Sequence, residues 1–112
     1  MTITAKRLYG PRMISTASIA YTVPVSTTAI IKQIAVCNTS TSAAGTFRIG
    51  VLGSADSTLD AADCFMFDAA IAAKETIMIN TSLVLNAQEK LAVFSGSGGA
   101  SISIMVNGIE EA

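Results

Sequence analysis

Residues 76–83 read TIMINTSL, and their side chains alternate in character along the chain. Successive side chains of a β-strand point to opposite faces, so a period of two indicates a strand with one buried face. The opposite side of this segment carries Met78, Asn80 and Ser82. The side chains expected on the buried face are Ile77, Ile79, Thr81 and Leu83.

Further segments with strand character lie on both sides of this one, with turn-forming residues between them. They are residues 19–23, 29–37, 46–52, 64–68, 91–95 and 101–107. Short strands with turn signals roughly every 8–12 residues are typical of an antiparallel sandwich or barrel, and no β–α–β spacing is present. We therefore predict an all-β fold, a single antiparallel β-sandwich of the jelly-roll kind with about seven to eight strands. The predicted sandwich domain spans residues 15–112.

The composition excludes several classes of function. The chain has 112 residues, a net charge of −1 and no His, and only 13% of its residues are charged, against about 25% in ordinary domains. A broad nucleic-acid binder needs a basic face, and His-dependent triads or His-ligated metal sites need His. Hydrophobic residues make up 51%, and the mean hydropathy is +0.57. This excess indicates surface that is buried against other copies or partners.

Neither membrane insertion nor export is expected. Residues 13–31 and 91–109 are uncharged and long enough for a span, but Ser and Thr crowd the first, and Gly96–Gly99 interrupts the second. No basic start followed by a clean apolar run is present, as a signal peptide would require. Cys37 and Cys64 are therefore expected to be free thiols.

No pattern in the chain predicts catalysis, a metal or a cofactor. Asp56, Asp60 and Asp63 lie in a long loop, but their spacing differs from that of a calcium loop. The glycines of 96–99 precede a strand and lack a nearby Lys, so they indicate a hairpin tip and not a phosphate cradle. Serines have no neighbouring base. We expect a protein that is not an enzyme.

The first fourteen residues stand apart from the strand pattern. Three of the seven basic residues, Lys6, Arg7 and Arg12, are interleaved there with Leu8 and Tyr9, and a Gly-Pro pair follows. We interpret residues 1–14 as an extended N-terminal arm, which either docks on an acidic neighbour or frays in solution. The five named residues are the predicted docking residues of this arm.

The chain resembles small virion proteins of tailed bacteriophages along nearly its whole length. The segments that carry the resemblance are TAKRLYGP at 4–11, YTVP at 21–24, TAIIKQI at 28–34, Asn38-Thr39, IAAKETI at 71–77 and LVLNAQEKL at 83–91. The last two are similar to the paired turn-and-strand segments of those proteins. Their turns often have Gly where this chain has Lys74 and Gln88, which is a departure from the pattern.

The resemblance implies a structural role in the virion. Such proteins are small β-sandwiches that assemble as symmetric oligomers on the capsid surface, at the neck and collar, or at the tail and fibre base. A homotrimer is the expected form here, in contact with major capsid, portal, neck or tail proteins, without nucleic acid or membrane, after assembly in the host cytoplasm. Met78, Phe94 and Met105, opposite the expected core faces, are the predicted subunit interface.

Two alternatives belong to other classes of function. A receptor-binding or carbohydrate-binding module at the tail tip would need exposed aromatic side chains for stacking. The chain has two Tyr, four Phe and no Trp, and most of the Phe fall on apolar strand faces. The other alternative, a small enzyme, lacks the residues described above.

Overall fold

The computed structural model describes residues 2–14, 18–96 and 101–112 as an all-β chain. The glycine tip expected at 96–99 falls mostly outside these residues. One 3-10 turn, η1, at Ala61–Asp63, precedes the fifth of eight strands. The strands are β1 (Ile3–Met13), β2 (Ser18–Thr22), β3 (Thr28–Asn38), β4 (Gly45–Leu52), β5 (Cys64–Ile71), β6 (Thr76–Leu85), β7 (Lys90–Ser95) and β8 (Ile102–Glu111).

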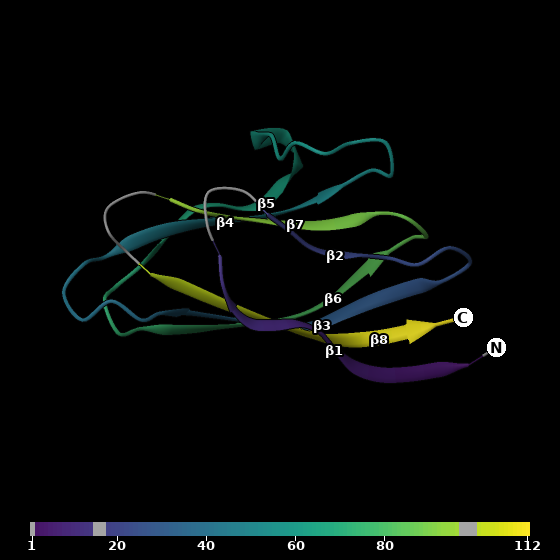
Figure 1. Ribbon diagram of the computed structural model, residues 1–112, viewed down its shortest axis with the longest axis horizontal. Helices are drawn as coiled ribbons and strands as arrows, with labels where there is room; N and C mark the ends of the chain where they lie inside the picture. The colour runs from purple at the N-terminus through teal and green to yellow at the C-terminus, as the bar shows by residue number, and fades with distance from the viewer. Residues whose placement is uncertain (1, 15–17, 97–100) are drawn as a thin grey trace.

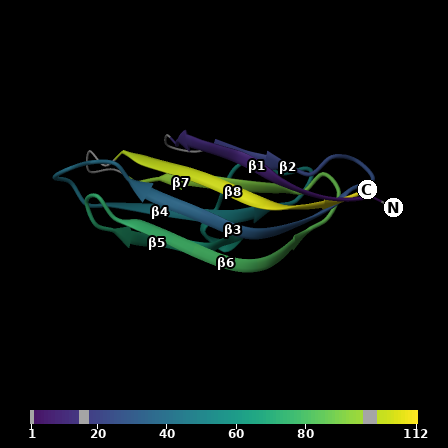
Figure 2. The ribbon, with the colours of Figure 1, turned by 90° about the horizontal axis from the view of Figure 1, so that it is seen from below.

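The strands form two four-stranded antiparallel sheets that pack face to face (Figure 1). The first sheet has the order β1-β8-β3-β6, and the second has the order β2-β7-β4-β5. Figure 2 shows β1 and β2 along one long side of the sandwich and β5 and β6 along the other. All consecutive strands except β4 and β5 lie in different sheets, and two four-stranded sheets connected in this way are the arrangement of a jelly roll. The predicted fold class is confirmed.

The segment expected to be a separate arm is in fact a strand of the sandwich. β1 pairs antiparallel with β8, from Ile3 opposite Glu111 to Met13 opposite Ser103. Without β1, the backbone groups on that side of β8 would be an unpaired sheet edge. The boundary predicted after residue 14 is therefore wrong. The segment is extended as expected, but the sheet holds it.

β1 follows β8 closely around Gly10, and its pairing shifts register between Arg7 and Tyr9 and again between Tyr9 and Arg12. Gly10 has φ +70°, and a Cβ there would collide with the carbonyl oxygen of Ile104. Glycine is therefore required at this position by both its backbone conformation and the close approach of β8.

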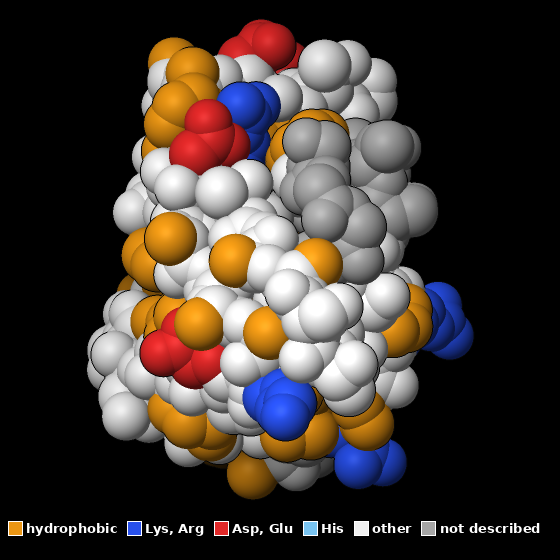
Figure 3. Space-filling model, turned by 90° about the vertical axis from the view of Figure 1, so that its left-hand side faces the viewer, with side chains coloured by type: hydrophobic (Ala, Val, Ile, Leu, Met, Phe, Trp, Pro, Cys, Tyr) orange, Lys and Arg blue, Asp and Glu red, His pale blue; other side chains and the backbone are white. Residues whose placement is uncertain are grey.

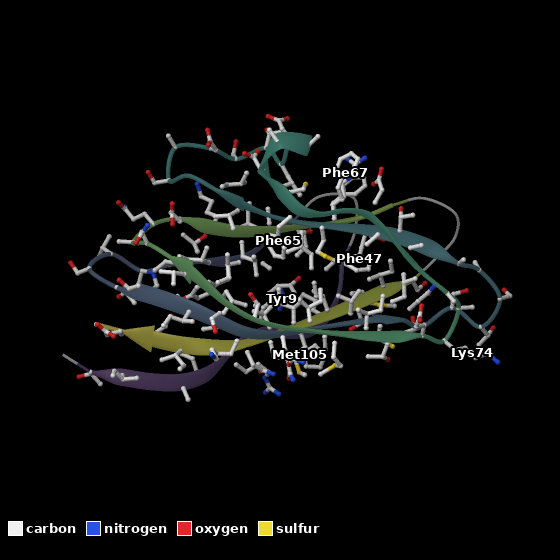
Figure 4. All side chains as sticks on the ribbon, turned by 180° about the vertical axis from the view of Figure 1, so that it is seen from behind. Tyr9, Phe47, Phe65, Phe67, Lys74 and Met105 are labelled. Carbon is white, nitrogen blue, oxygen red and sulfur yellow. The ribbon has the colours of Figure 1, made fainter. Side chains whose placement is uncertain are left out.

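The core between the sheets is thin and consists mainly of Ile, Leu and Val. Phe47 is its one fully buried aromatic side chain among the described residues, and it lies between the two sheets in Figure 4. The molecule measures 47 × 26 × 18 Å. β-branched side chains suit such closely packed layers. The odd positions of β6 face inward and its even positions outward, as the alternation in 76–83 predicts.

Two turns, one before and one after β6, have the same construction. In the turn of residues 72–75, the Glu75 amide donates to the carbonyl oxygen of Ala72 (3.1 Å), and the Glu75 carboxylate accepts from the Ala72 amide (2.8 Å). The turn of residues 86–89 repeats both bonds, at 3.1 and 2.6 Å. The third residues, Lys74 and Gln88, have φ of 65° and 68°. These are the positions where the resembling proteins often have Gly.

Candidate functional site: the outer faces and edges of the sandwich

The outer face of the first sheet carries apolar side chains in rows across the strands. Ala35 of β3 lies between Met78 of β6 and Met105 of β8, its two register partners. The Met78 side chain is 48% exposed, and Met105 is half-buried. In Figure 4 Met105 points away from the opposite sheet. The structure therefore brings these two predicted interface residues onto one surface, and their role in an interface stays a prediction.

A second apolar row crosses the same sheet nearer the chain termini. Ile30 of β3 is paired with Val84 of β6 and with Ile109 of β8, and Ile109 is paired with Ala5 of β1. Val84 is 53% exposed. Together with the Met78–Ala35–Met105 row, these residues make the outer face a surface suited to contact with another protein.

An amide ladder separates the two apolar rows. The Gln33 amide nitrogen donates to the Asn80 side-chain oxygen (3.3 Å), and the Asn107 amide donates to the Gln33 side-chain oxygen (3.4 Å). The Lys32 ammonium donates to the Ser82 hydroxyl (2.9 Å) beside it. Polar groups in the middle of this face are thus paired with each other within the sheet, and two exposed cations lie beside them, Lys32 and, opposite Asn107, Arg7.

The third predicted interface residue, Phe94, lies elsewhere. It is on β7 in the second sheet, so its outward side chain is on the opposite side of the sandwich from Met78 and Met105. The three predicted interface residues therefore lie on two opposite faces of the sandwich, and the role of Phe94 in an interface also stays a prediction. Alternation identifies which side chains leave the core, but it does not say which of the two sheets they leave.

Phe94 belongs instead to a cluster around Arg48 of β4. The Arg48 guanidinium lies 4.9 Å from the Phe94 ring centroid and 4.3 Å from that of Phe67, which points outward in Figure 4. It also donates to both carboxylate oxygens of Asp68, at 2.6 and 3.1 Å. This hydrogen-bonded pairing raises the pKa of Arg48 and lowers the pKa of Asp68. Arg48 therefore combines cation–π contacts to two rings with a two-point ion pair.

The sequence analysis missed the exposure of two aromatic side chains on β5. Phe65 and Phe67 are 44% and 51% exposed, although most Phe residues were expected on apolar faces. Their alternation with Cys64 and Met66 in 64–67 was the available signal.

Cys64, like Cys37 of β3, is a free thiol, as expected, and burial raises the Cys64 pKa.

The predicted docking residues of the arm are mostly engaged within the sandwich. The Lys6 ammonium lies 3.0 Å from a Glu110 carboxylate oxygen. Leu8 and Tyr9 pack against the core, and the Arg12 guanidinium lies 5.5 Å from the Tyr9 ring. Arg7 and Arg12 nevertheless remain exposed, and docking by these residues stays a prediction.

Glu110 also joins the two sheets at one end of the sandwich. Its carboxylate accepts a hydrogen bond from the Tyr21 hydroxyl of β2, in addition to the contact with Lys6 of β1. The hydrogen bonds from Tyr21 and Lys6 lower the pKa of Glu110. Burial, and then the hydrogen bond to Glu110, raise the pKa of Tyr21.

The loop of residues 53–63 covers part of the outer face of the second sheet. It is held by the Lys90 ammonium, which donates to the carbonyl oxygens of Ser54 (2.8 Å) and Asp56 (2.6 Å). Between the loop and the sheet is a hollow of about 70 Å³, lined by Ser18, Ile19, Ser57, Leu59 and Ala92. Ligand sites usually enclose about 300–1,000 Å³, so this hollow is too small for one.

The acidic part of this loop forms no metal site in the described residues. An open hollow of about 310 Å³ is lined by Asp56, Asp60 and Asp63 with their neighbours. The Asp63 carboxylate accepts from the Asp60 amide (3.1 Å), which is a local turn contact. No group of three or more acidic or Cys side chains in the described part of the chain could hold a metal ion. Across residues 2–14, 18–96 and 101–112, no helix has the length and apolar character to cross a bilayer.

Strand order and surface together define the class of protein: an eight-stranded jelly-roll sandwich whose outer faces carry few charges. Figure 3 shows one end of it, where apolar side chains are scattered among Lys, Arg, Asp and Glu side chains and the white surface of other side chains and backbone.

No protein-family model and no curated protein matches the chain. A solved structure, titled "Structure of infectious bursal disease virus Gt strain", is similar to it with a TM-score of 0.48 and 10% sequence identity. The alignment covers 97% of this chain and 29% of that one, so this chain spans less than a third of the matched chain.

Proposed function

We propose that the protein is a non-enzymatic structural subunit of a virus particle, and specifically of a tailed-bacteriophage virion. The observation that carries the proposal is a jelly roll whose first sheet presents two apolar rows to solvent. Jelly rolls recur in viral capsid and lectin domains, but fold alone does not imply function. A subunit of a shell also needs a surface that contacts other subunits, and the two exposed apolar rows provide one.

The mechanism is burial of the outer face of the first sheet against other copies or neighbouring virion proteins. Met78 and Met105 are suited to this role because methionine side chains are flexible and fill irregular contacts. The chain has few charges overall, and the desolvation cost of such a contact comes from Lys32 and Arg7 on this face. Location on the capsid, at the neck and collar or at the tail, assembly in the host cytoplasm, and a closed homotrimer remain parts of the proposal that come from the sequence resemblance.

Copy number in purified particles tests the proposal. Particles from a culture that makes this protein are banded on a density gradient, and the chain is quantified by mass spectrometry. Hundreds of copies indicate capsid decoration, and about a dozen indicate the neck or tail, since ring-like assemblies there have low cyclic symmetry. Absence of the chain from the particle band would refute a virion role.

Substitutions test the surface without disturbing the fold. The double variant M78S/M105S should lower incorporation into particles, whereas V25S, at another exposed apolar position (67% exposed), should not. Deletion of residues 1–13 is not a clean test of docking, because it removes β1 from β8. R7A and R12A address the remaining exposed cations of β1 instead.

A receptor-binding or carbohydrate-binding role is the second candidate. The exposed rings of Phe65 and Phe67 favour it, since aromatic side chains can stack on sugar rings. A glycan-array signal that F67A abolishes, or loss of host adsorption with intact particles, would establish it. A glycan array without detectable binding, together with normal host adsorption, would exclude this role.

A further inference from the structure

We propose that the free edge of β6 is a contact between two copies of this chain, related by a two-fold axis at Thr81. In this contact, the four strands of the first sheet in each copy join into one continuous antiparallel sheet. The contact rests on the self-association in the proposed function, but a two-fold axis makes a dimer, so it stands in place of the closed homotrimer that the resemblance implies.

Three of the four sheet edges carry features that oppose pairing with another chain. Native edges are protected by charges, proline, bulges or shortness. β1 carries Lys6, Arg7 and Pro11, and β2 has only five residues. β5 has two register shifts and a left-handed residue, Asp68, with φ 48°. Continuous strand addition is therefore disfavoured at these three edges.

β6 lacks most of these features. It has ten residues, and its sequence contains no charged residue, no proline and no glycine. Its exposure alternates without interruption from Thr76 to Val84, and its pairing with β3 has a single register shift, between Asn80 and Leu83, where β6 has one residue more than β3. It forms the outer strand of its sheet along the long side of the sandwich in Figure 2. A long uncharged edge of this kind is a template for another strand.

The side chains of β6 are complementary to a second copy of themselves. Directly opposite residues in an antiparallel pair lie on the same face of the sheet. With Thr81 opposite Thr81 of the second copy, Met78 lies opposite Val84, and Asn80 lies opposite Ser82. Met78 and Val84 are the two exposed large apolar side chains of the strand, at 48% and 53%. This register pairs apolar with apolar and polar with polar.

The neighbouring register is less favourable, which is why the axis is assigned to Thr81. Centred on Asn80, the pairing would put Met78 opposite Ser82 and Thr76 opposite Val84, and each apolar side chain would face a polar one. The inward side chains also favour the Thr81 register, because Ile79 would meet Leu83. Both are only half-buried in the single chain, and the contact would cover them.

Cysteine cross-linking tests the register directly. In a background with C37S and C64S, single cysteines are placed at residues 79 to 83 and oxidised. Identical residues on the axis of an antiparallel pair have Cα atoms about 4.5–5.5 Å apart, within the range of a disulfide. We expect the disulfide-linked dimer to be most abundant for T81C. A maximum at residue 80, or equal linkage at all five positions, would overturn the assignment.

A charge pair tests the contact without cysteine. M78E and V84K should each weaken dimerisation about tenfold, and the double variant M78E/V84K should restore it, since the new charges face each other across the axis. The two positions are six residues apart on one strand, about 20 Å, so they cannot pair within a copy. V25K is the matched control and should leave dimerisation unchanged.

The oligomeric state, measured by light scattering after size exclusion, distinguishes failure of the β6 contact from failure of the proposed self-association. A trimer, or a dimer that responds to none of the β6 variants, overturns the β6 contact and leaves the proposed self-association standing. A monomer at all concentrations overturns both, while incorporation into particles tests the virion role independently. Circular dichroism and thermal melts verify that the variants fold, in particular those at the half-buried residues 79, 81 and 83.

Discussion

Glycine at the two turns that flank β6 should stabilise the fold. Lys74 and Gln88 each occupy the third position of a four-residue turn with φ above 60°. A side chain in the left-handed region costs about 1–2 kcal/mol. Glycine avoids this cost but loses about 0.5–1 kcal/mol more in conformational entropy on folding. The difference is a gain of about 0.5–1 kcal/mol for K74G, and a similar gain for Q88G.

The two gains should add, because the turns lie at opposite ends of β6 and share no partner. For a domain of this size, 1 kcal/mol moves the Tm by about 4 °C. Each single variant should therefore melt about 2–4 °C higher, and the double variant K74G/Q88G about 4–8 °C higher, in thermal unfolding followed by circular dichroism.

The preceding residues of the same turns supply the matched controls. Ala73 and Ala87 are not in the left-handed region, so A73G and A87G incur only the entropic cost and should lower the Tm. If K74G lowered the Tm as much as A73G does, the left-handed backbone would not be the source of the strain, and the reasoning would be refuted.

Three further predictions concern the core, the 53–63 loop and the contact of Glu110 with Tyr21 that joins the two sheets. F47A should cost about 3–5 kcal/mol in chemical denaturation because it empties the buried centre of the sandwich; a cost below 1 kcal/mol would contradict that placement. G50A should cost about 1–3 kcal/mol, since a Cβ there would lie 2.5 Å from the Leu59 side chain, and proteolysis of the 53–63 loop should increase; an unchanged digestion rate would count against the packed loop. The lowered pKa of Glu110 stabilises the fold at pH above its ordinary value of 4.5, and that stability is lost as the pH falls through the lowered pKa. Y21F should therefore reduce the acid dependence of the free energy of unfolding. Because the pKa of Tyr21 is raised in the folded protein, the native chain should also lose stability above pH 10. If the stability of Y21F and of the native chain changed with pH in parallel, the contact between Tyr21 and Glu110 would not stabilise the fold.

The strands themselves followed from local patterns. Alternation in segments such as 76–83 and 46–52 identified both the strand and its buried side, because the period of two is a property of the extended backbone. The position of the turns at 72–75 and 86–89 was also recognisable. The exception was β1, whose charges and Gly10-Pro11 pair were interpreted as an arm. Those features are typical of an edge strand as well as of a tail.

The candidate site depended on information that local patterns do not contain. Met78 and Met105 come together, and Phe94 separates from them, only because of the order in which the strands pair. The Arg48 cluster likewise assembles residues of β4, β5 and β7.

By itself, the sequence determined that this protein is all-β, where most of its strands lie, which side chains leave the core, and that charge is scarce on its surface. These are consequences of backbone geometry and composition, which act over a few residues. Only the tertiary structure decided that residues 3–13 complete the first sheet, which outward side chains share a face, and that β6 is left as a long unprotected edge. Those outcomes depend on pairing between strands as far apart as β1 and β8, and such pairing is set by packing of the whole core.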